Sequence, residues 1–210
     1  MTKRTLGLTV TTLVAMAFAP SSLAMAQSVA DSSRVMLYLA VGGGGETELE
    51  TDPASILEGT VDNEATVGVG ARFEAPLMDY LSLGAMVDLL SYEIDGADRR
   101  PSGHFDLWAK ARYVVDMDGD LALEAYLGVP VGFSVVAYES SDLLKREKRW
   151  LGWNIGALLG AQLFFTERFG AMLEAGWRRF QVYNETDGGD TEASFTSNQF
   201  AFNMGGVFLF

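Results

Sequence analysis

The chain of 210 residues contains no cysteine and only one histidine. Without cysteine it has no disulfide framework and no lipid-modified N-terminal cysteine. No paired-histidine metal motif and no glycine-rich phosphate loop is present. Asp116, Asp118 and Asp120 imitate the start of a calcium loop, but Leu121 follows at once and the required Gly and Glu are missing. We therefore expect no metal site and no cofactor.

Basic residues are also scarce, with 15 Lys and Arg against 28 Asp and Glu and a net charge of -13. This balance disfavours nucleic-acid binding, which needs a basic surface. The acids concentrate in two stretches, 46–64 and 185–192. They are Glu46, Glu48, Glu50, Asp52, Glu58, Asp62, Glu64, Glu185, Asp187, Asp190 and Glu192. These acids could bind divalent cations or a basic partner. The favoured interpretation is that the two stretches are solvated, mobile loops kept soluble by their charge.

Long apolar runs are missing beyond the first 26 residues. At the start, Lys3 and Arg4 precede an apolar stretch, and Ala24-Met25-Ala26 forms a small-x-small cleavage pattern. The apolar stretch is short and Pro20 ends it, which argues against a membrane-anchoring helix. We predict a signal peptide over residues 1–26, cut before Gln27, and a single mature domain over residues 27–210.

Residues 150–165 are mostly apolar and carry a glycine at every fourth position, a pattern typical of packed transmembrane helices. The stretch is short for a membrane span and contains Asn154 and Gln162. Both amides fall on the same face as the three glycines if the chain is extended. A strand is therefore the better prediction.

Period-two alternation of apolar and polar residues runs through the mature chain. It predicts eight strands: Arg34 to Val41, Thr66 to Ala75, Tyr80 to Tyr92, Gly103 to Val115, Leu121 to Tyr138, Trp150 to Thr166, Arg168 to Tyr183 and Asn198 to Phe210. One face of each strand holds no charge, whereas the other is rich in Gly, Ser and charged residues. A soluble lipocalin-like barrel would show the same period. The glycine-rich polar face suits a crowded, narrow interior and favours lipid outside.

The connections between these segments alternate in length. Those after the second, fourth and sixth segments are short, whereas those after the odd-numbered segments are long. Short turns on one side and long loops on the other, with an even strand count, allow closure without an edge. The predicted fold is all-β: a membrane-spanning, eight-stranded, antiparallel up-and-down β-barrel.

The last strand alternates cleanly and ends on Phe208, Leu209 and Phe210. With the signal peptide and the loop asymmetry, it resembles the closing strand of bacterial outer-membrane β-barrel proteins. The resemblance covers the whole mature chain. It implies an outer-membrane location, short turns and both termini in the periplasm, and long loops outside. It also implies that Phe208 and Phe210 belong to a signal read by the assembly machinery.

Nine charged residues fall on the predicted lumen face: Arg72, Glu74, Asp88, Asp106, Lys110, Arg112, Glu124, Glu174 and Arg178. Eight strands leave room only for side chains, and buried charges must pair. We expect Arg112 and Glu124 to face one another across the turn between their strands. Glu174 and Arg178 should reach neighbouring strands. The lumen is predicted to be plugged.

Small proteins of the resembled group include adhesion and structural barrels and a few enzymes acting on lipid A. The favoured function is a non-enzymatic, monomeric barrel with a structural or surface-interaction role, whose loops contact an extracellular partner. A small-solute pore is the first alternative. A lipid A enzyme, using His104 with Asp106 and Ser102, is the second. Arg149 and Arg179 have two interpretations: a lipopolysaccharide contact, since arginine binds phosphate bidentately, or solvent-facing bases at a loop.

Overall fold

The computed structural model describes residues 24–52, 59–92, 99–117, 121–137, 149–185 and 192–210. Most of the predicted signal peptide, residues 1–23, lies outside this set. So do three of the predicted acidic loop residues: Glu58, Asp187 and Asp190.

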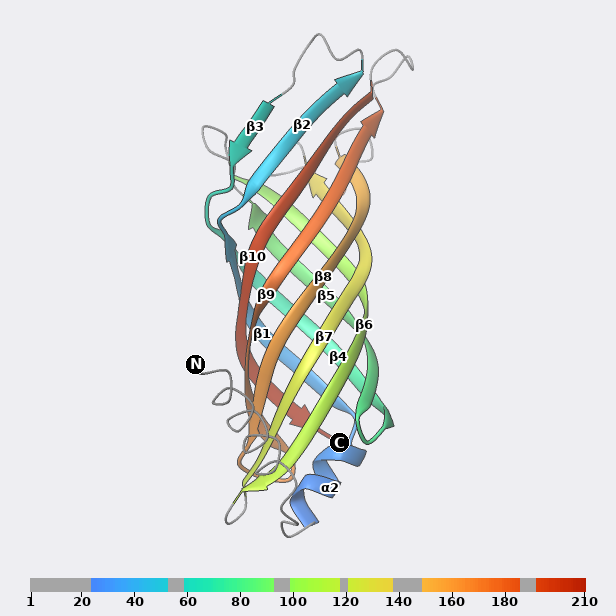
Figure 1. The fold of residues 1–210 in the computed structure, drawn as a ribbon, viewed down its shortest axis with the longest axis vertical. Coiled ribbons are helices and arrows are strands. Elements are labelled where there is room, and N and C mark those ends of the chain that lie inside the picture. Colours follow the sequence, from blue (N-terminus) through green and yellow to red (C-terminus); the bar gives the residue numbers. More distant parts are fainter. Residues whose placement is uncertain (1–23, 53–58, 93–98, 118–120, 138–148, 186–191) are drawn as a thin grey trace, which may run out of the picture.

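Eight antiparallel strands form a closed barrel (Figure 1). They are β1 (Arg34–Gly43), β4 (Thr66–Met78), β5 (Leu81–Tyr92), β6 (Arg100–Met117), β7 (Leu121–Ala137), β8 (Arg149–Phe164), β9 (Phe169–Glu185) and β10 (Glu192–Leu209). Each pairs with the next, and β10 returns to pair with β1 from Arg34–Leu209 to Gly43–Phe200. This confirms the predicted fold class. The transmembrane-helix alternative for 150–165 is wrong, because that stretch is strand β8.

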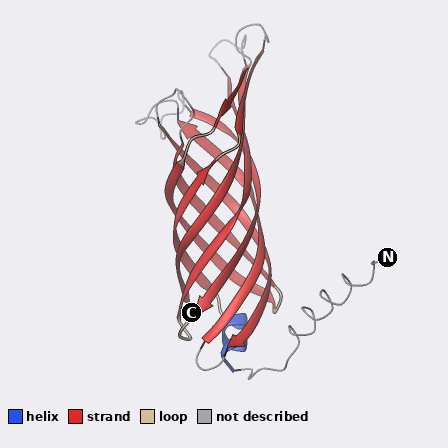
Figure 2. Cartoon of the chain, turned by 60° about the vertical axis from the view of Figure 1, so that its left-hand side comes forward, coloured by secondary structure: helices blue, strands red, loops and turns tan. Residues whose placement is uncertain are grey.

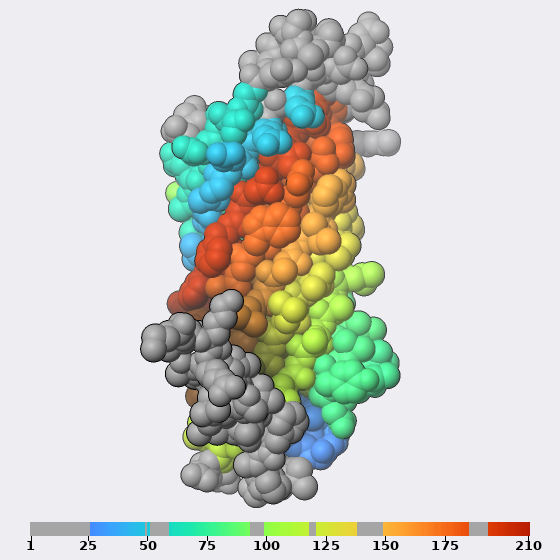
Figure 3. Space-filling view, viewed as in Figure 1, coloured from blue at the N-terminus to red at the C-terminus, as the bar shows by residue number. Residues whose placement is uncertain are grey.

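The alternation seen in the sequence separates two environments. Outward side chains such as Leu107 and Leu159 are 75% and 68% exposed, whereas inward Trp108 is 1% exposed. The outer wall is thus apolar around the ring, which is the arrangement of a barrel surrounded by lipid. Figure 3 shows the strands as slanting bands, side by side along this wall. Among the described helices, none is long and apolar enough to cross a membrane.

The interior is narrow enough to require glycine opposite its largest rings. A Cβ added at Gly128 would overlap the Trp108 indole, and one at Gly160 would overlap the Tyr126 phenol. These positions are therefore set by close approach between neighbouring strands, as the glycine-rich lumen face predicted.

The two ends of the barrel differ (Figure 2). At one end β4 joins β5 and β8 joins β9 through short turns, and Phe210 lies at this end with the helix α2 (Ala24–Asp31). At the other end β1, β5, β7 and β9 finish and β4, β6, β8 and β10 begin. We refer to these as the turn end and the loop end.

The first acidic stretch is not simply a solvated loop, and here the prediction was wrong. It contains β2 (Glu46–Asp52) and β3 (Gly59–Asp62), which extend the sheet beyond β10. Strand β10 begins at Glu192, six residues before the predicted Asn198, and its first residues pair with β2. Alternation was present in this stretch, with exposed Glu46, Glu48 and Glu50 around the buried Thr47. Its apolar face was missing, so the strand signal was hidden. We call β2, β3 and the paired ends of β9 and β10 the wing.

Candidate functional site

The lumen is the candidate site, and it is filled by ionised side chains. Among the described residues, five bases and five acids are buried there: Arg34, Arg72, Lys110, Arg112, Arg178, Glu74, Asp88, Asp106, Glu124 and Glu174. The set is formally neutral. It contains all nine predicted lumen charges and adds Arg34.

The layer nearest the turn end is centred on Glu124 of β7. Its carboxylate accepts hydrogen bonds from Lys110 at 2.7 Å and from Arg34 at 2.9 Å, and Arg112 lies at 3.5 Å. Lys110 also forms an ion pair with Glu74. Three bases facing two acids leave one positive charge. The backbone carbonyls of α2 offset this charge, because Arg34 and Arg112 donate to them.

The middle layer is centred on Glu174 of β9. Arg72 approaches it across the lumen with two hydrogen bonds, at 2.9 and 2.5 Å. Tyr126 donates to the same carboxylate at 2.6 Å and Asn203 at 2.7 Å. The Arg72 guanidinium lies 3.7 Å from the centroid of a Trp108 ring. Glu174 therefore joins four strands at one level, β4, β7, β9 and β10.

The layer toward the loop end is centred on Arg178 of β9. It forms an ion pair with Asp88, donates to Asp106 at 2.5 Å and to Asn154 at 3.1 Å. Tyr38 adds a 2.6 Å hydrogen bond to Asp88. Two acids around one base leave a negative charge here, opposite in sign to the excess at the turn end.

The pairing of His104 with Asp106, on which the enzyme alternative depends, is not found. His104 is buried, and its Nδ1 lies 2.6 Å from the hydroxyl of Ser134. Asp106 is held by Arg178 instead, and Ser102 has no hydrogen bond to either. The ring of His104 packs 5.3 Å from that of Phe180, centroid to centroid. Asp106 therefore does not orient His104 as a general base would require.

A group of buried polar side chains, which we call the polar knot, fixes the wing to the barrel at its loop end. The hydroxyl of Tyr92 contacts Thr47 of β2, Asn63 and Ser197 of β10, the last at 3.0 Å. Asn63 also donates to the backbone carbonyl of Asn198 at 2.8 Å. Beside this knot lies a buried apolar cluster: Tyr92, Val136, Phe180, Val182 and Phe195, with Trp150 packed against it. Neither the polar knot nor the apolar cluster was predicted from the sequence.

A cavity of about 10 Å³ lies beside Asp88, Arg178 and Gln199. That volume holds about one water molecule. Within the described part of the chain, no three acidic or histidine side chains are placed to hold a metal ion.

Solved protein structures share this barrel fold. The outer membrane protein OprG of Pseudomonas aeruginosa aligns over 86% of this chain and 96% of its own, at 11% identity and a TM-score of 0.57. The chain has the fold of a bacterial outer-membrane β-barrel. Neisserial surface protein A aligns over 80% of this chain and 95% of its own, at 14% identity and a TM-score of 0.36. No family model matches the sequence, and neither does any curated protein.

Arg149 and Arg179 both lie on the outward-facing positions of this outer-membrane barrel, but not side by side. Arg179 pairs in register with Ile155 of β8, six residues from Arg149 on that strand. Six residues span about 20 Å along a strand. The two side chains therefore do not converge on one phosphate. The Nε atom of each has no hydrogen-bond partner.

Phe208 and Phe210 lie at the turn end, at the seam that closes the barrel. The Phe210 ring centroid is 6.3 Å from that of Phe73 and 6.2 Å from that of Phe208. The Phe210 amide donates to the carbonyl of Ser33 at 3.0 Å. The last residue thus bonds to the segment that enters β1.

Proposed function

We propose that the protein is an integral outer-membrane barrel with a structural or surface-interaction role and a lumen closed by its own side chains. The observation that carries this proposal is the paired, neutral set of ten buried charges across the lumen. A conducting pore needs a continuous aqueous path, whereas eight strands leave room only for side chains. Here the apolar cluster and the polar knot lie above the charges, and α2 lies below them.

The orientation follows from the asymmetry of the two ends. Outer-membrane barrels place short turns in the periplasm and long connections outside. We infer that the wing projects from the cell surface and that α2 and Phe210 lie in the periplasm. The wing is held by buried contacts at Thr47 and Asn63, so it offers an ordered surface for an extracellular partner.

A lipid A enzyme is the weaker candidate. His104 is buried beneath the apolar cluster, and Asp106 is held by Arg178. A general base must reach the proton that it abstracts. We therefore propose a non-enzymatic role for this barrel, acting as a monomer.

Planar-bilayer recording tests the closed lumen directly. We expect the purified protein to show no stable conductance, because its lumen charges are paired and the cavity beside Asp88 and Arg178 holds only about one water. As a control, Trp108→Gly with Tyr126→Gly removes the two largest rings of the middle layer and should give measurable openings. Long-lived, reproducible openings from the unaltered protein would make the pore the better function.

Lipopolysaccharide is the proposed lipid partner, and Arg179 is its proposed contact. Arg179 follows the exposed Trp177 on the outer wall toward the loop end, at the edge of the apolar band. We expect Arg179→Gln, with or without Arg149→Gln, to reduce the rise in melting temperature on adding lipopolysaccharide. Arg168→Gln is the matched control, since Arg168 is exposed at the turn end. An equal rise in all variants would reject this contact.

A further inference from the structure

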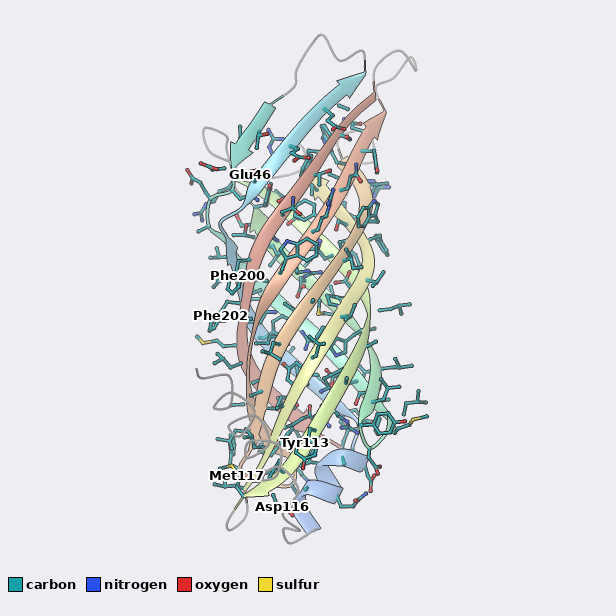
Figure 4. All side chains as sticks on the ribbon, viewed as in Figure 1. Glu46, Tyr113, Asp116, Met117, Phe200 and Phe202 are labelled. Atoms are coloured by element: carbon teal, nitrogen blue, oxygen red, sulfur yellow. The ribbon has the colours of Figure 1, made fainter. Side chains whose placement is uncertain are left out.

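The helix α2 is fixed to the turn end of the barrel at both of its ends. At its start, the amide of Ala26 donates to Oδ1 of Asp116 at 2.7 Å. At its end, Arg34 donates to the carbonyl of Val29 at 2.9 Å and Arg112 to that of Ala30 at 2.5 Å. A carboxylate at the start and cations at the end complement the helix dipole. Figure 4 shows Asp116 at the turn end of β6, beside α2.

The contacts at the end of α2 also belong to the lumen. Arg34 and Arg112 are two of the three bases around Glu124, and Val29 is fully buried beneath them. The two carbonyls thus offset the positive charge left in this layer. Residues 27–33 therefore close the lumen at the turn end as part of the charge network.

The predicted cleavage site lies inside α2, between Ala26 and Gln27. Hydrolysis of this peptide bond consumes one water, leaves a carboxylate on Ala26 and frees an α-ammonium on Gln27. The Ala26 amide, which donates a hydrogen bond to Asp116, then leaves with the cleaved peptide. The new ammonium stands one residue further along the same turn. Asp116 has capacity for it, because its buried Oδ2 has no hydrogen-bond partner.

A free N-terminal glutamine is chemically unstable. Its unprotonated amine attacks the carbon of its own side-chain amide, forms a five-membered lactam and expels ammonia. Two contacts here oppose that reaction. Gln27 Nε2 donates to Oδ2 of Asp31 at 2.9 Å, which directs the side-chain amide along the helix. An ammonium paired with Asp116 stays protonated and does not attack.

We propose that export processing completes a built-in periplasmic plug: the ammonium freed at Gln27 pairs with Asp116, fixes residues 27–33 under the barrel and protects Gln27 from cyclisation. The proposal rests on the predicted cleavage site and is independent of the role of the wing. Asp116 is then a docking site for the processed terminus of the chain itself.

Intact-mass measurement and N-terminal sequencing of protein extracted from outer membranes test this proposal. We expect the mature chain to begin at Gln27 with its side-chain amide intact. During incubation at neutral pH, the folded protein should lose ammonia several-fold more slowly than the same protein in denaturant. Asp116→Asn should remove most of this protection, and Asp31→Asn part of it. Asp79→Asn, at an exposed turn of the same end, should leave it unchanged.

Three results would overturn the proposal. One is a mature chain that begins at a residue other than Gln27. Another is cyclisation of the folded protein at the denatured rate. The third is full protection in folded Asp116→Asn. If that variant does not fold, two measurements still test the proposal. They are the rate of ammonia loss from folded against denatured wild-type protein, and the same rate in folded Asp31→Asn.

Discussion

Replacing Glu174 by alanine is expected to lower the free energy of unfolding by about 3–5 kcal/mol, the range for breaking a buried ion pair. The Arg72 guanidinium would lose its bidentate partner while staying buried beside Trp108. Tyr126 and Asn203 would lose their acceptor as well. Urea unfolding of the detergent-folded protein, followed by tryptophan fluorescence, measures the change.

Leu173→Ala is the matched control, because Leu173 is the neighbouring residue on β9 and is 52% exposed on the outer wall. It should cost far less, since the side chain is not buried within the protein. A loss for Glu174→Ala no greater than that of the control would mean that Arg72 finds another partner. Glu74, at 3.8 Å, is the nearest acid available to it.

The face on which each charge lies was predictable, whereas its partner was not. Alternation assigns Arg72 and Glu174 to the lumen, but they are 102 residues apart in the chain and meet across the barrel. Which charges share a level depends on strand tilt and register, and neither is visible in the alternation. The same limit explains Asp106: its sequence neighbour on that face is His104, but Arg178 reaches it from β9.

Arg34 and α2 were missed for a different reason. Arg34 is the first residue of the first strand. A single charged residue just before an alternating apolar face is easily taken for the boundary of the strand and not for part of the lumen. Its importance appears only when Glu124, 90 residues later, and Gln162, 128 residues later, are brought beside it. Helix α2 spans the predicted cleavage site, so its residues were divided between signal peptide and mature terminus. Its contact with Arg112 joins residues 82 apart in the chain, and neither that contact nor the one with Arg34 has a signature in the sequence.

Deleting Phe210 is expected to reduce the folded outer-membrane fraction several-fold and to leave unfolded protein in the periplasm. The residue directly follows β10, the strand that must pair with β1, and its amide donates to the carbonyl of Ser33. Its loss removes this bond and the ring contacts with Phe73 and Phe208 at the seam. Until the seam closes, β1 and β10 are open edges, which lipid cannot satisfy. Heat-modifiable migration of membrane and periplasmic fractions measures the folded share.

Phe165→Ala is the control that distinguishes a specific role of Phe210 at the seam from a general loss of exposed aromatic surface. Phe165 lies at the same end and is 49% exposed, against 62% for Phe210, but it stands at the turn between β8 and β9, away from the seam. We expect it to fold normally, and Phe210→Tyr to keep most of the assembly. If Phe210 deletion and Phe165→Ala lowered the folded fraction equally, lipid-facing aromatic area would explain the effect. The seam residue would then carry no assembly signal of its own.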